Sequence, residues 1–170
     1  RVNGKESHYD NGRGYIEKDW GKSFPAAWVW FQSNHFKSIS ACITGSVAII
    51  PWVGSSFKGF IVGFWLDGKL HRFTTYRSSK IESLEISDTH VAWVLRNRTH
   101  RLRLNAFCAE GGLLRGPTHL DMGKRVMETL NASIHVQLET LKGRVLFDGM
   151  GENAGLEVIG DLPRLLAEKP

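Results

Sequence analysis

The sequence predicts an all-β fold, an antiparallel barrel or barrel-like sandwich that ends in a short helix. Three observations indicate it. About ten short segments show the period-two alternation or the β-branched composition of strands. Glycine is frequent, with 18 in 170 residues, which suits many tight turns. The segments also follow one another without the regularly spaced helices of a parallel sheet. Since one hydrophobic core can serve a chain of this length, we expect residues 1–170 to form a single barrel-like domain.

The first two expected strands lie on either side of a turn-rich segment, residues 21–27. Residues 15–20 and 28–36 both have strand periodicity. In the first strand, Glu17 and Asp19 share a face with Tyr15. In the second strand, one face carries aromatic and amide side chains together, namely Trp28, Trp30, Gln32, Asn34 and Phe36. The residues between these five would occupy the opposite face.

The middle of the chain is typical of a meander of antiparallel strands. Residues 38–50 are rich in β-branched side chains and end at Pro51, and Asp67-Gly68 is a two-residue hairpin signal. Residues 53–58 are expected to form a loop. The strands expected here are residues 38–50, 59–66, 69–76, 81–86, 91–95 and 102–109.

The last third of the chain contains the longest expected strand and a terminal helix. We expect a turn-rich link at 111–117, a short helix or loop at 122–130, a long strand from 130, and short strands at 144–147 and 154–159. Asp161 is then placed as the N-cap of a terminal helical turn, in whose first turn Pro163 is tolerated.

Composition and charge exclude several functional classes. The formal net charge is +5, but no nucleic-acid-binding motif is present, so we expect no nucleic-acid partner. The seven histidines lack ligand spacing, and neither Cys42 nor Cys108 lies in a CxxC pair, so no metal site is predicted. No apolar run is long enough to span a bilayer and no signal-peptide pattern opens the sequence. These observations favour a cytoplasmic localisation.

Four arginines gather around one expected hairpin: Arg96, Arg98, Arg101 and Arg103. Because Leu102 and Leu104 alternate with Arg101 and Arg103, one face of this strand is basic and the other packs against the core. A solvated face is the simplest interpretation. The second interpretation is peripheral contact with an anionic membrane surface, where each charge contributes about 1 kcal/mol.

The polar and aromatic side chains of residues 15–36 have two interpretations. Two carboxylates and two amides beside large rings suit a pocket that holds an apolar ligand and binds its polar head. Alternatively, the tryptophans fill a core and the polar side chains contact water or one another.

The same stretch resembles the signature of a known family. Residues 17–25, E-K-D-W-G-K-S-F-P, and residues 28–36, W-x-W-x-Q-x-N-x-F, resemble the tocopherol cyclase family and its bacterial members. Residues 114–118 and 154–158 fit the same family. The resemblance implies a lipocalin-like barrel. It also implies that the chain is the C-terminal half of a longer two-half protein, whose N-terminal half packs against this one.

The resemblance further implies acid chemistry on a hydrophobic small molecule, a prenylated hydroquinone or a related isoprenoid. One double bond is protonated and a phenol oxygen closes a ring, which requires no redox cofactor and no metal. A carboxylic acid can act in this way when burial keeps it protonated. The catalytic candidates are Glu17 and Asp19. Glu17 is preferred because plant-type members carry an amide at the position of Asp19.

The resemblance also suggests which side chains would bind the ligand. Trp20, Trp28 and Trp30 could present ring faces to a developing cation, at roughly 0.5–2 kcal/mol each. Gln32 and Asn34 could bind the quinol hydroxyls. The alternative function is a non-catalytic lipocalin-like binding protein for a hydrophobic quinone or isoprenoid. A third possibility is a structural half-domain.

Overall fold

The structure is a computed structural model that describes residues 3–8, 10–18, 24–37, 40–116 and 124–168. For residues 114–116 and 124–127 it describes the backbone only. Its regular elements are β1 (Ala27–Ser33), β2 (His35–Phe36), β3 (Ala41–Trp52), β4 (Ser55–Leu66), β5 (Lys69–Thr74), the 3-10 turn η1 (Thr75–Arg77), β6 (Lys80–Ile86), β7 (His90–Arg96), β8 (His100–Phe107), β9 (Gly112–Gly116), β10 (Lys124–Thr140), β11 (Val145–Gly160) and α1 (Leu162–Ala167).

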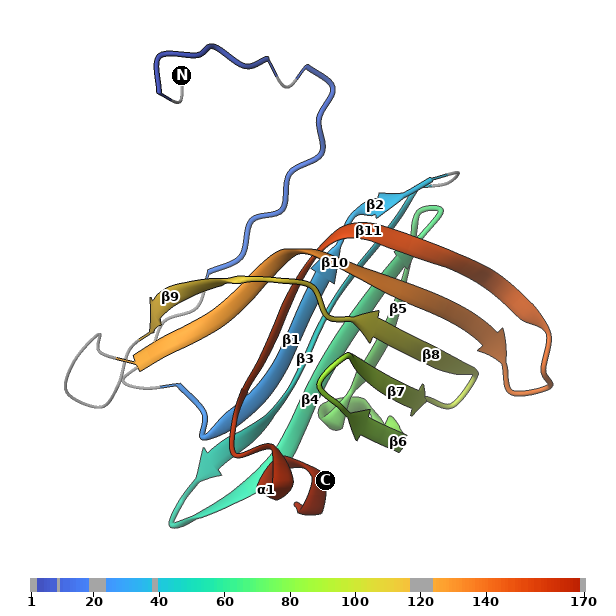
Figure 1. Cartoon of the computed structure of the whole chain (residues 1–170). Coiled ribbons are helices and arrows are strands. Elements are labelled where there is room, and N and C mark those ends of the chain that lie inside the picture. Colours follow the sequence, from blue (N-terminus) through green and yellow to red (C-terminus); the bar gives the residue numbers. More distant parts are fainter. Residues whose placement is uncertain (1–2, 9, 19–23, 38–39, 117–123, 169–170) are drawn as a thin grey trace.

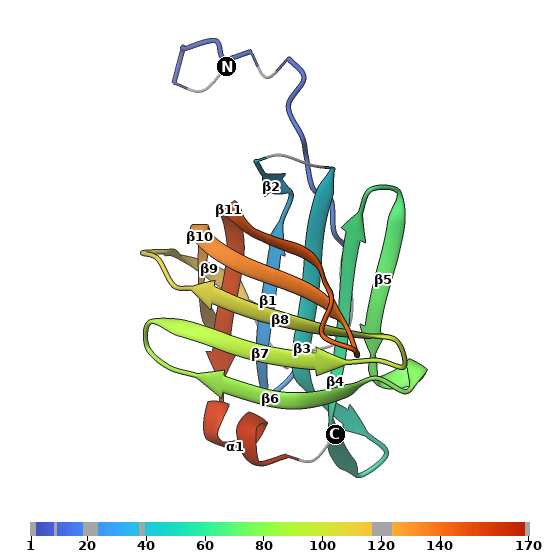
Figure 2. The same ribbon diagram turned by 90° about the vertical axis from the view of Figure 1, so that its right-hand side faces the viewer.

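All eleven described strands belong to one antiparallel sheet with the order β5-β4-β3-β1-β11-β10-β8-β7-β6. Strand β2 pairs with β11, and β9 pairs with β10. The sheet curls, so that β6, β7 and β8 lie across β1, β3, β4 and β5, and the long strands β10 and β11 bend from one layer to the other (Figures 1 and 2). Within the described residues β5 and β6 do not pair with each other. The fold is therefore a curled antiparallel half-barrel, which confirms the predicted class.

The core fills the space between the two layers. Alternate residues of β1, including Val29 and Phe31, point into it and are almost completely buried. The ring of Phe31 packs edge-on against Trp93 of β7 with 6.0 Å between centroids, and Phe60 of β4 meets the same indole at 6.2 Å. Aromatic rings thus occupy the position in which a lipocalin-like barrel would hold its ligand.

Residues 15–20 were expected to form a strand, and this expectation is wrong over the described part. Residues 15–18 have no strand partner in the structure, and residues 19 and 20 lie outside it. The strand expected at 28–36 is divided, since β1 ends at Ser33 and β2 begins at His35. The Ser33 hydroxyl donates to the carbonyl of Glu152 (2.9 Å) and accepts from the His35 amide (3.3 Å), which replaces the regular ladder.

This break changes the face on which Phe36 lies. Phe36 was expected beside Trp28 and Trp30, but it is 7% exposed and belongs to the main core with Val29. Because strand side chains alternate with a period of two, an irregularity at Asn34 transfers every later residue to the other face.

Several expected loops are strands in the structure. The segment 53–58 is a two-residue turn followed by β4 from Ser55, and the expected link 111–117 contains β9. Residues 124–130 belong to β10, where a helix or loop was expected. The two short strands expected at 144–147 and 154–159 are one continuous strand, β11. The pairing of β11 with β10 is irregular between Thr129 and Ala132. Such an irregularity interrupts the alternation of apolar and polar residues by which a strand is predicted.

The C-terminal helix α1 forms as expected. The side chain of Asp161 accepts from the amide of Arg164 (3.1 Å), which is the bond of an N-cap, and Pro163 occupies the first turn. Leu165 of this helix is fully buried in the main core. The helix therefore closes one end of the half-barrel.

A pair of histidines joins β5 of one layer to the start of β8 in the other. The rings of His71 (β5) and His100 (β8) meet edge-on with 4.9 Å between centroids, and His71 is 7% exposed. Burial lowers the pKa of both imidazoles below 6.5, and the charge of Lys69 lowers both further.

We expect the free energy of unfolding to fall as the pH is lowered through the range in which His71 and His100 become protonated. The unfolded chain binds protons on these two histidines at a higher pH than the folded chain does, so acid favours unfolding and higher pH restores stability. Urea denaturation at about pH 7.5 and about pH 5.5 measures the difference. His71→Gln should make this difference smaller, whereas His35→Gln at an exposed position should leave it unchanged. An equal pH response of His71→Gln and the parent chain would contradict the assignment.

Candidate functional site

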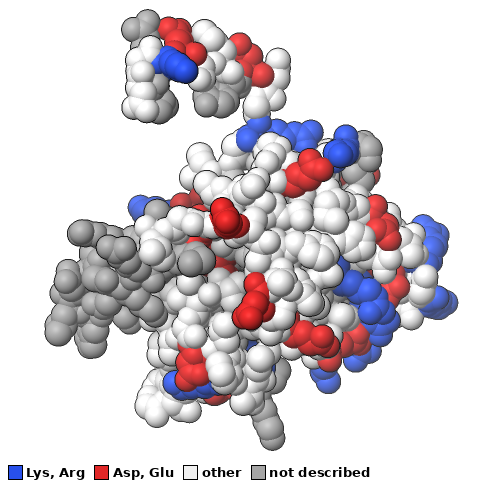
Figure 3. All heavy atoms as spheres, in the orientation of Figure 1, with Lys and Arg blue, Asp and Glu red and all other residues white. Residues whose placement is uncertain are grey.

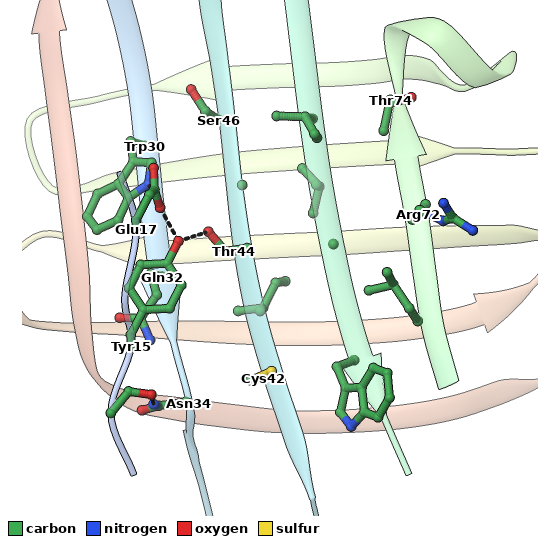
Figure 4. A pocket seen from close by; sticks show the side chains of 18 residues that line it. Tyr15, Glu17, Trp30, Gln32, Asn34, Cys42, Thr44, Ser46, Arg72 and Thr74 are labelled. Atoms are coloured by element: carbon green, nitrogen blue, oxygen red, sulfur yellow. Dashed lines mark hydrogen bonds between the residues drawn. The ribbon is translucent and has the colours of Figure 1, made fainter. Parts of the chain in front are cut away.

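A hollow of about 700 Å³ lies on the outer face of the layer formed by β1, β3, β4 and β5. Figure 4 views it with the N-terminal segment in front of β1 and the other layer behind the sheet. The side chains that line it alternate with those of the core, so that Trp30 and Gln32 of β1 face the hollow while Phe31 faces inward. The site is therefore on the convex side of the half-barrel and not in its interior.

Glu17 lies at the β1 side of the hollow and is held by two donors. The indole Nε1 of Trp30 donates to Oε2 of Glu17 (3.1 Å), and the hydroxyl of Tyr15 donates to the same oxygen. The Tyr15 hydroxyl also contacts Oγ1 of Thr44 on β3 at 2.9 Å, as the dashed lines in Figure 4 show. Strands β1 and β3 thus fix one carboxylate at the edge of the hollow, although Glu17 itself belongs to an irregular segment.

The two predicted amides have different surroundings. Gln32 is 8% exposed and contributes to the lining. Asn34 also lines the hollow, but its Nδ2 donates to the backbone carbonyl of Gly14 (3.1 Å). The amide of Asn34 therefore anchors the N-terminal segment to the sheet beside Glu17.

The opposite wall of the hollow is mainly apolar and comes from β4 and β5. Ile61 and Trp65 of β4 are 58% and 40% exposed, and Leu70 of β5 is 46% exposed. Arg72 and Thr74 complete this wall. The sequence reasoning missed these residues, although the alternation of the two expected strands around Asp67-Gly68 already placed them on one face. The result is a site with a polar side at β1 and an apolar side open to solvent.

Cys42 of β3 lies in the floor of the hollow. Burial raises the pKa of its thiol, against the opposing charge of Arg13.

One predicted site residue that the structure describes, Trp28, does not line this hollow. Trp28 lies on the same face of β1, but it packs with Ala48 and Ile159, and its Nε1 donates to Oε2 of Glu157 (2.6 Å). Asp19 and Trp20 lie outside the described residues. Within the described part of the chain no group of three or more His, Cys, Asp or Glu side chains is arranged to hold a metal ion.

The arginine hairpin has the predicted alternation, with Leu102 and Leu104 buried and Arg101 outward. The outward cations are paired. Glu82 binds Arg96 and Arg101, while Glu139 binds Arg101 and Arg103. The hydrogen bond from Arg101 lowers the pKa of Glu82. Arg98 donates to the Ser78 hydroxyl at 3.4 Å. Blue and red atoms accordingly lie side by side towards the right-hand edge of Figure 3.

The described helical residues include no segment of the length and apolarity needed to cross a bilayer. Contact of the arginine hairpin with a membrane surface stays a prediction.

The fold and the site define the class of this protein, a curled antiparallel half-barrel with an apolar hollow on the outer face of one layer. The family is identified by comparison of the sequence. The chain belongs to the tocopherol cyclase-like family, whose model matches residues 1–160. This confirms the resemblance seen in residues 17–36.

Two curated relatives show how much of a longer protein the chain represents. It is 26% identical over 171 residues to a protein named tocopherol cyclase, chloroplastic, of Zea mays, covering 92% of this chain and 35% of that protein. It is 27% identical over 174 residues to a probable tocopherol cyclase, chloroplastic, of Oryza sativa subsp. japonica, covering 92% of this chain and 36% of that protein. The chain thus spans little more than a third of the length of these relatives.

A solved structure also resembles the chain. Kievitone hydratase from Nectria haematococca is 14% identical, with a TM-score of 0.43 over 80% of this chain and 40% of that one.

Gly155 of β11 allows the indole of Trp30 to approach the neighbouring strand closely. A Cβ at this position would lie 2.8 Å from Cζ3 of Trp30, closer than side-chain packing permits. Gly155→Ala should displace the indole and remove its hydrogen bond to Glu17. We expect a loss of about 1–3 kcal/mol in the free energy of unfolding, measured by urea denaturation.

The matched control is Gly112→Ala, because no atom lies within 4 Å of the added methyl group there. A free energy of unfolding that is the same in Gly155→Ala and the parent chain would contradict the close contact between Gly155 and the indole of Trp30.

Proposed function

We propose that the hollow is part of a tocopherol cyclase-like active site, in which Glu17 is the acid that protonates an isoprenoid double bond. The substrate class is a prenylated hydroquinone or a related isoprenoid with a polar head. The single observation that supports this proposal is the position of Glu17, one carboxyl group held by Trp30 and Tyr15 at the edge of an apolar hollow.

The proposed reaction balances without any co-reactant. Glu17 donates its proton to the less substituted carbon of the double bond, which leaves a tertiary cation on the other carbon. The phenol oxygen of the substrate attacks that cation and closes the ring. The phenolic proton then returns to the carboxylate and restores the acid, so that the product is an isomer of the substrate.

The geometry suits this sequence of steps at three points. Oε2 of Glu17 accepts both hydrogen bonds, so we assign the transferable proton to Oε1. The ring of Trp30 lies beside Glu17, where its face can stabilise a cation. Gln32 lines the same side of the hollow and can bind a quinol hydroxyl.

Proton transfer to an alkene also requires that water be excluded. Glu17 is exposed in this chain, and Ile61, Trp65 and Leu70 face solvent across the hollow. We propose that a further part of a longer protein, such as an N-terminal half, packs on the outer face of β3 and β4 and covers the hollow. Asp19 and Trp20, which follow Glu17 in the family signature, are proposed to contribute to the same covered site.

A second candidate function is ligand binding without turnover. It is favoured by the open side of the hollow, because binding of a hydrophobic quinone or isoprenoid needs apolar contact but not complete exclusion of water. In this case the hydrogen bonds to Glu17 hold the N-terminal segment in place and transfer no proton.

The test is the conversion of a prenylated benzoquinol by the full-length protein in deuterium oxide. We expect a chromanol identified by chromatography and mass spectrometry. It should carry one deuteron on the former alkene carbon that received the proton, adjacent to the carbon that now bonds to the phenol oxygen. Glu17→Gln should lower kcat by about 10²–10⁴-fold and leave substrate affinity within about threefold.

The matched control is Glu85→Gln, an exposed carboxylate on β6 in the other layer. A folded Glu17→Gln protein that turns over at the parent rate removes Glu17 from the acid role. Substrate that binds and is recovered without deuterium would instead establish the second candidate function.

A further inference from the structure

One charged side chain at the hollow takes no part in either function proposed above. Arg72 of β5 is exposed and belongs to the wall opposite Glu17. Of the described residues that line the hollow, Arg72 is the only cation and Glu17 the only carboxylate. The guanidinium of Arg72 makes no ion pair and no hydrogen bond with the described part of the chain, where only its backbone carbonyl accepts, from Nδ2 of Asn97 (3.1 Å). This charge is therefore available to a ligand.

The register of the sheet places Arg72 at the end of a row that crosses the hollow. In this row Gln32 of β1 lies opposite Thr44 of β3. Thr44 lies opposite Gly63 of β4, and Gly63 lies opposite Arg72. Since neighbouring strands are about 4.8 Å apart, three steps separate the backbones of Gln32 and Arg72 by roughly 14 Å. Figure 4 shows Gln32 and Arg72 on opposite sides of the hollow, in this order.

The row has the form of a trough because Gly63 has no side chain. The atom nearest to a Cβ added there would be Cδ1 of Leu70, at 3.4 Å. Ile61 and Trp65, two residues to either side of Gly63 on the same strand, both line the hollow. A narrow apolar molecule can therefore lie over Gly63 between these two side chains, with its ends at the two ends of the row.

The two charged side chains give such a molecule a direction. Glu17 lies at the β1 end, where an ionised carboxylate would repel an anion. The guanidinium of Arg72 lies at the β5 end and can bind a carboxylate through two parallel hydrogen bonds. If a further part of a longer protein covers the hollow, water is removed from it, and a cation without water requires an anionic partner.

The charge of the wall also limits which anion fits. A single guanidinium neutralises a monoanion such as a carboxylate. A phosphate monoester would bring nearly two negative charges to the same place. No second cation lines the hollow among the described residues, so a carboxylate matches the site better than a phosphate.

We propose that Arg72 forms a subsite for a carboxylate of the ligand. The ligand is then an amphiphile with a hydrogen-bonding head at Gln32, an apolar body over Gly63 and a carboxylate at Arg72. The inference rests on the proposed function, because it describes the ligand of the same hollow. Within that substrate class it selects prenylated hydroquinones or related isoprenoids whose side chain ends in a carboxylate. It applies equally to binding without turnover.

The test is equilibrium binding of two probes, measured by isothermal titration calorimetry on this chain and on the full-length protein. One probe is a benzoquinol whose decyl side chain ends in a carboxylate, and the other is the methyl ester of the same compound. We expect the carboxylate to bind at least about fivefold more tightly than the ester. Arg72→Gln should reduce this preference to less than about twofold by weakening the carboxylate alone, and Arg72→Lys should give an intermediate preference.

Two matched variants control for charge elsewhere. Arg77→Gln removes an exposed arginine of η1, which follows β5 but does not line the hollow. Arg13→Gln removes the charge of the N-terminal segment that acts on Cys42 in the floor of the hollow. Both should keep the preference for the carboxylate. Because the Arg72 side chain is exposed, Arg72→Gln should unfold in urea at the same concentration as the parent chain.

Three results would overturn the inference. Equal affinity of the parent chain for both probes would remove the subsite and leave the proposed function standing, since the ester would still occupy the hollow. A preference that survives Arg72→Gln, or that Arg13→Gln abolishes, would place the carboxylate elsewhere. A preference shown by this chain but not by the full-length protein would indicate that an acidic residue of the longer protein pairs with Arg72.

Failure of the proposed function has different signatures. Turnover at the parent rate in Glu17→Gln, with the carboxylate preference intact, would remove the acid role and leave the subsite standing. Binding of neither probe would remove both the subsite and the ligand site on which it depends.

Discussion

The register of strand β1 determines where everything else in this protein lies. β1 pairs with β3 on one side and with β11 on the other, and Trp30 is opposite Ser46 and Glu157 in the two ladders. With this register Val29 and Phe31 enter the core, while Trp30 and Gln32 turn to the outer face. A shift by one residue would exchange the two sets completely. The two faces of strand β1 therefore contribute to the core and to the hollow, respectively, and one register fixes both.

The fold class was accessible from the sequence because most strands alternate clearly. The hairpin at Asp67-Gly68, the buried face of β8 and the N-cap at Asp161 follow from local rules that the structure obeys. Predictions from local sequence patterns were wrong where contacts between distant parts of the chain determine the structure. Residues 15–18 have strand periodicity but find no ladder partner, and Ser33 exchanges ladder hydrogen bonds for side-chain ones, which turns Phe36 into the core. The irregular pairing of β10 and β11 likewise hid the first part of β10, before residue 130, and the continuity of β11.

The candidate site was predicted in part. Sequence reasoning named Glu17, Trp30, Gln32 and Asn34, and all four line one hollow. It did not name Ile61, Trp65 and Leu70, because nothing local relates strands β4 and β5 to β1. The lipocalin-like barrel that the resemblance implies would hold a ligand in its interior, but here the rings of Phe31, Phe60 and Trp93 fill that space. Which face of a sheet carries a site depends on how the layers close, and that is a property of the whole chain rather than of any segment.

The double partnership of β1 also has a consequence for how the chain reaches its folded state. Strand β3 follows β1 closely, so their pairing is a local event, and the hairpin to β4 extends it. Strand β11 lies far along the chain, with Trp28 and Glu157 separated by 129 residues. Closing so long a loop costs more entropy than forming a hairpin, and contacts of this kind form late. The outer face beside Trp30 is therefore completed only when the last strand docks, and a chain interrupted before β11 would contain the residues of the hollow without their final support.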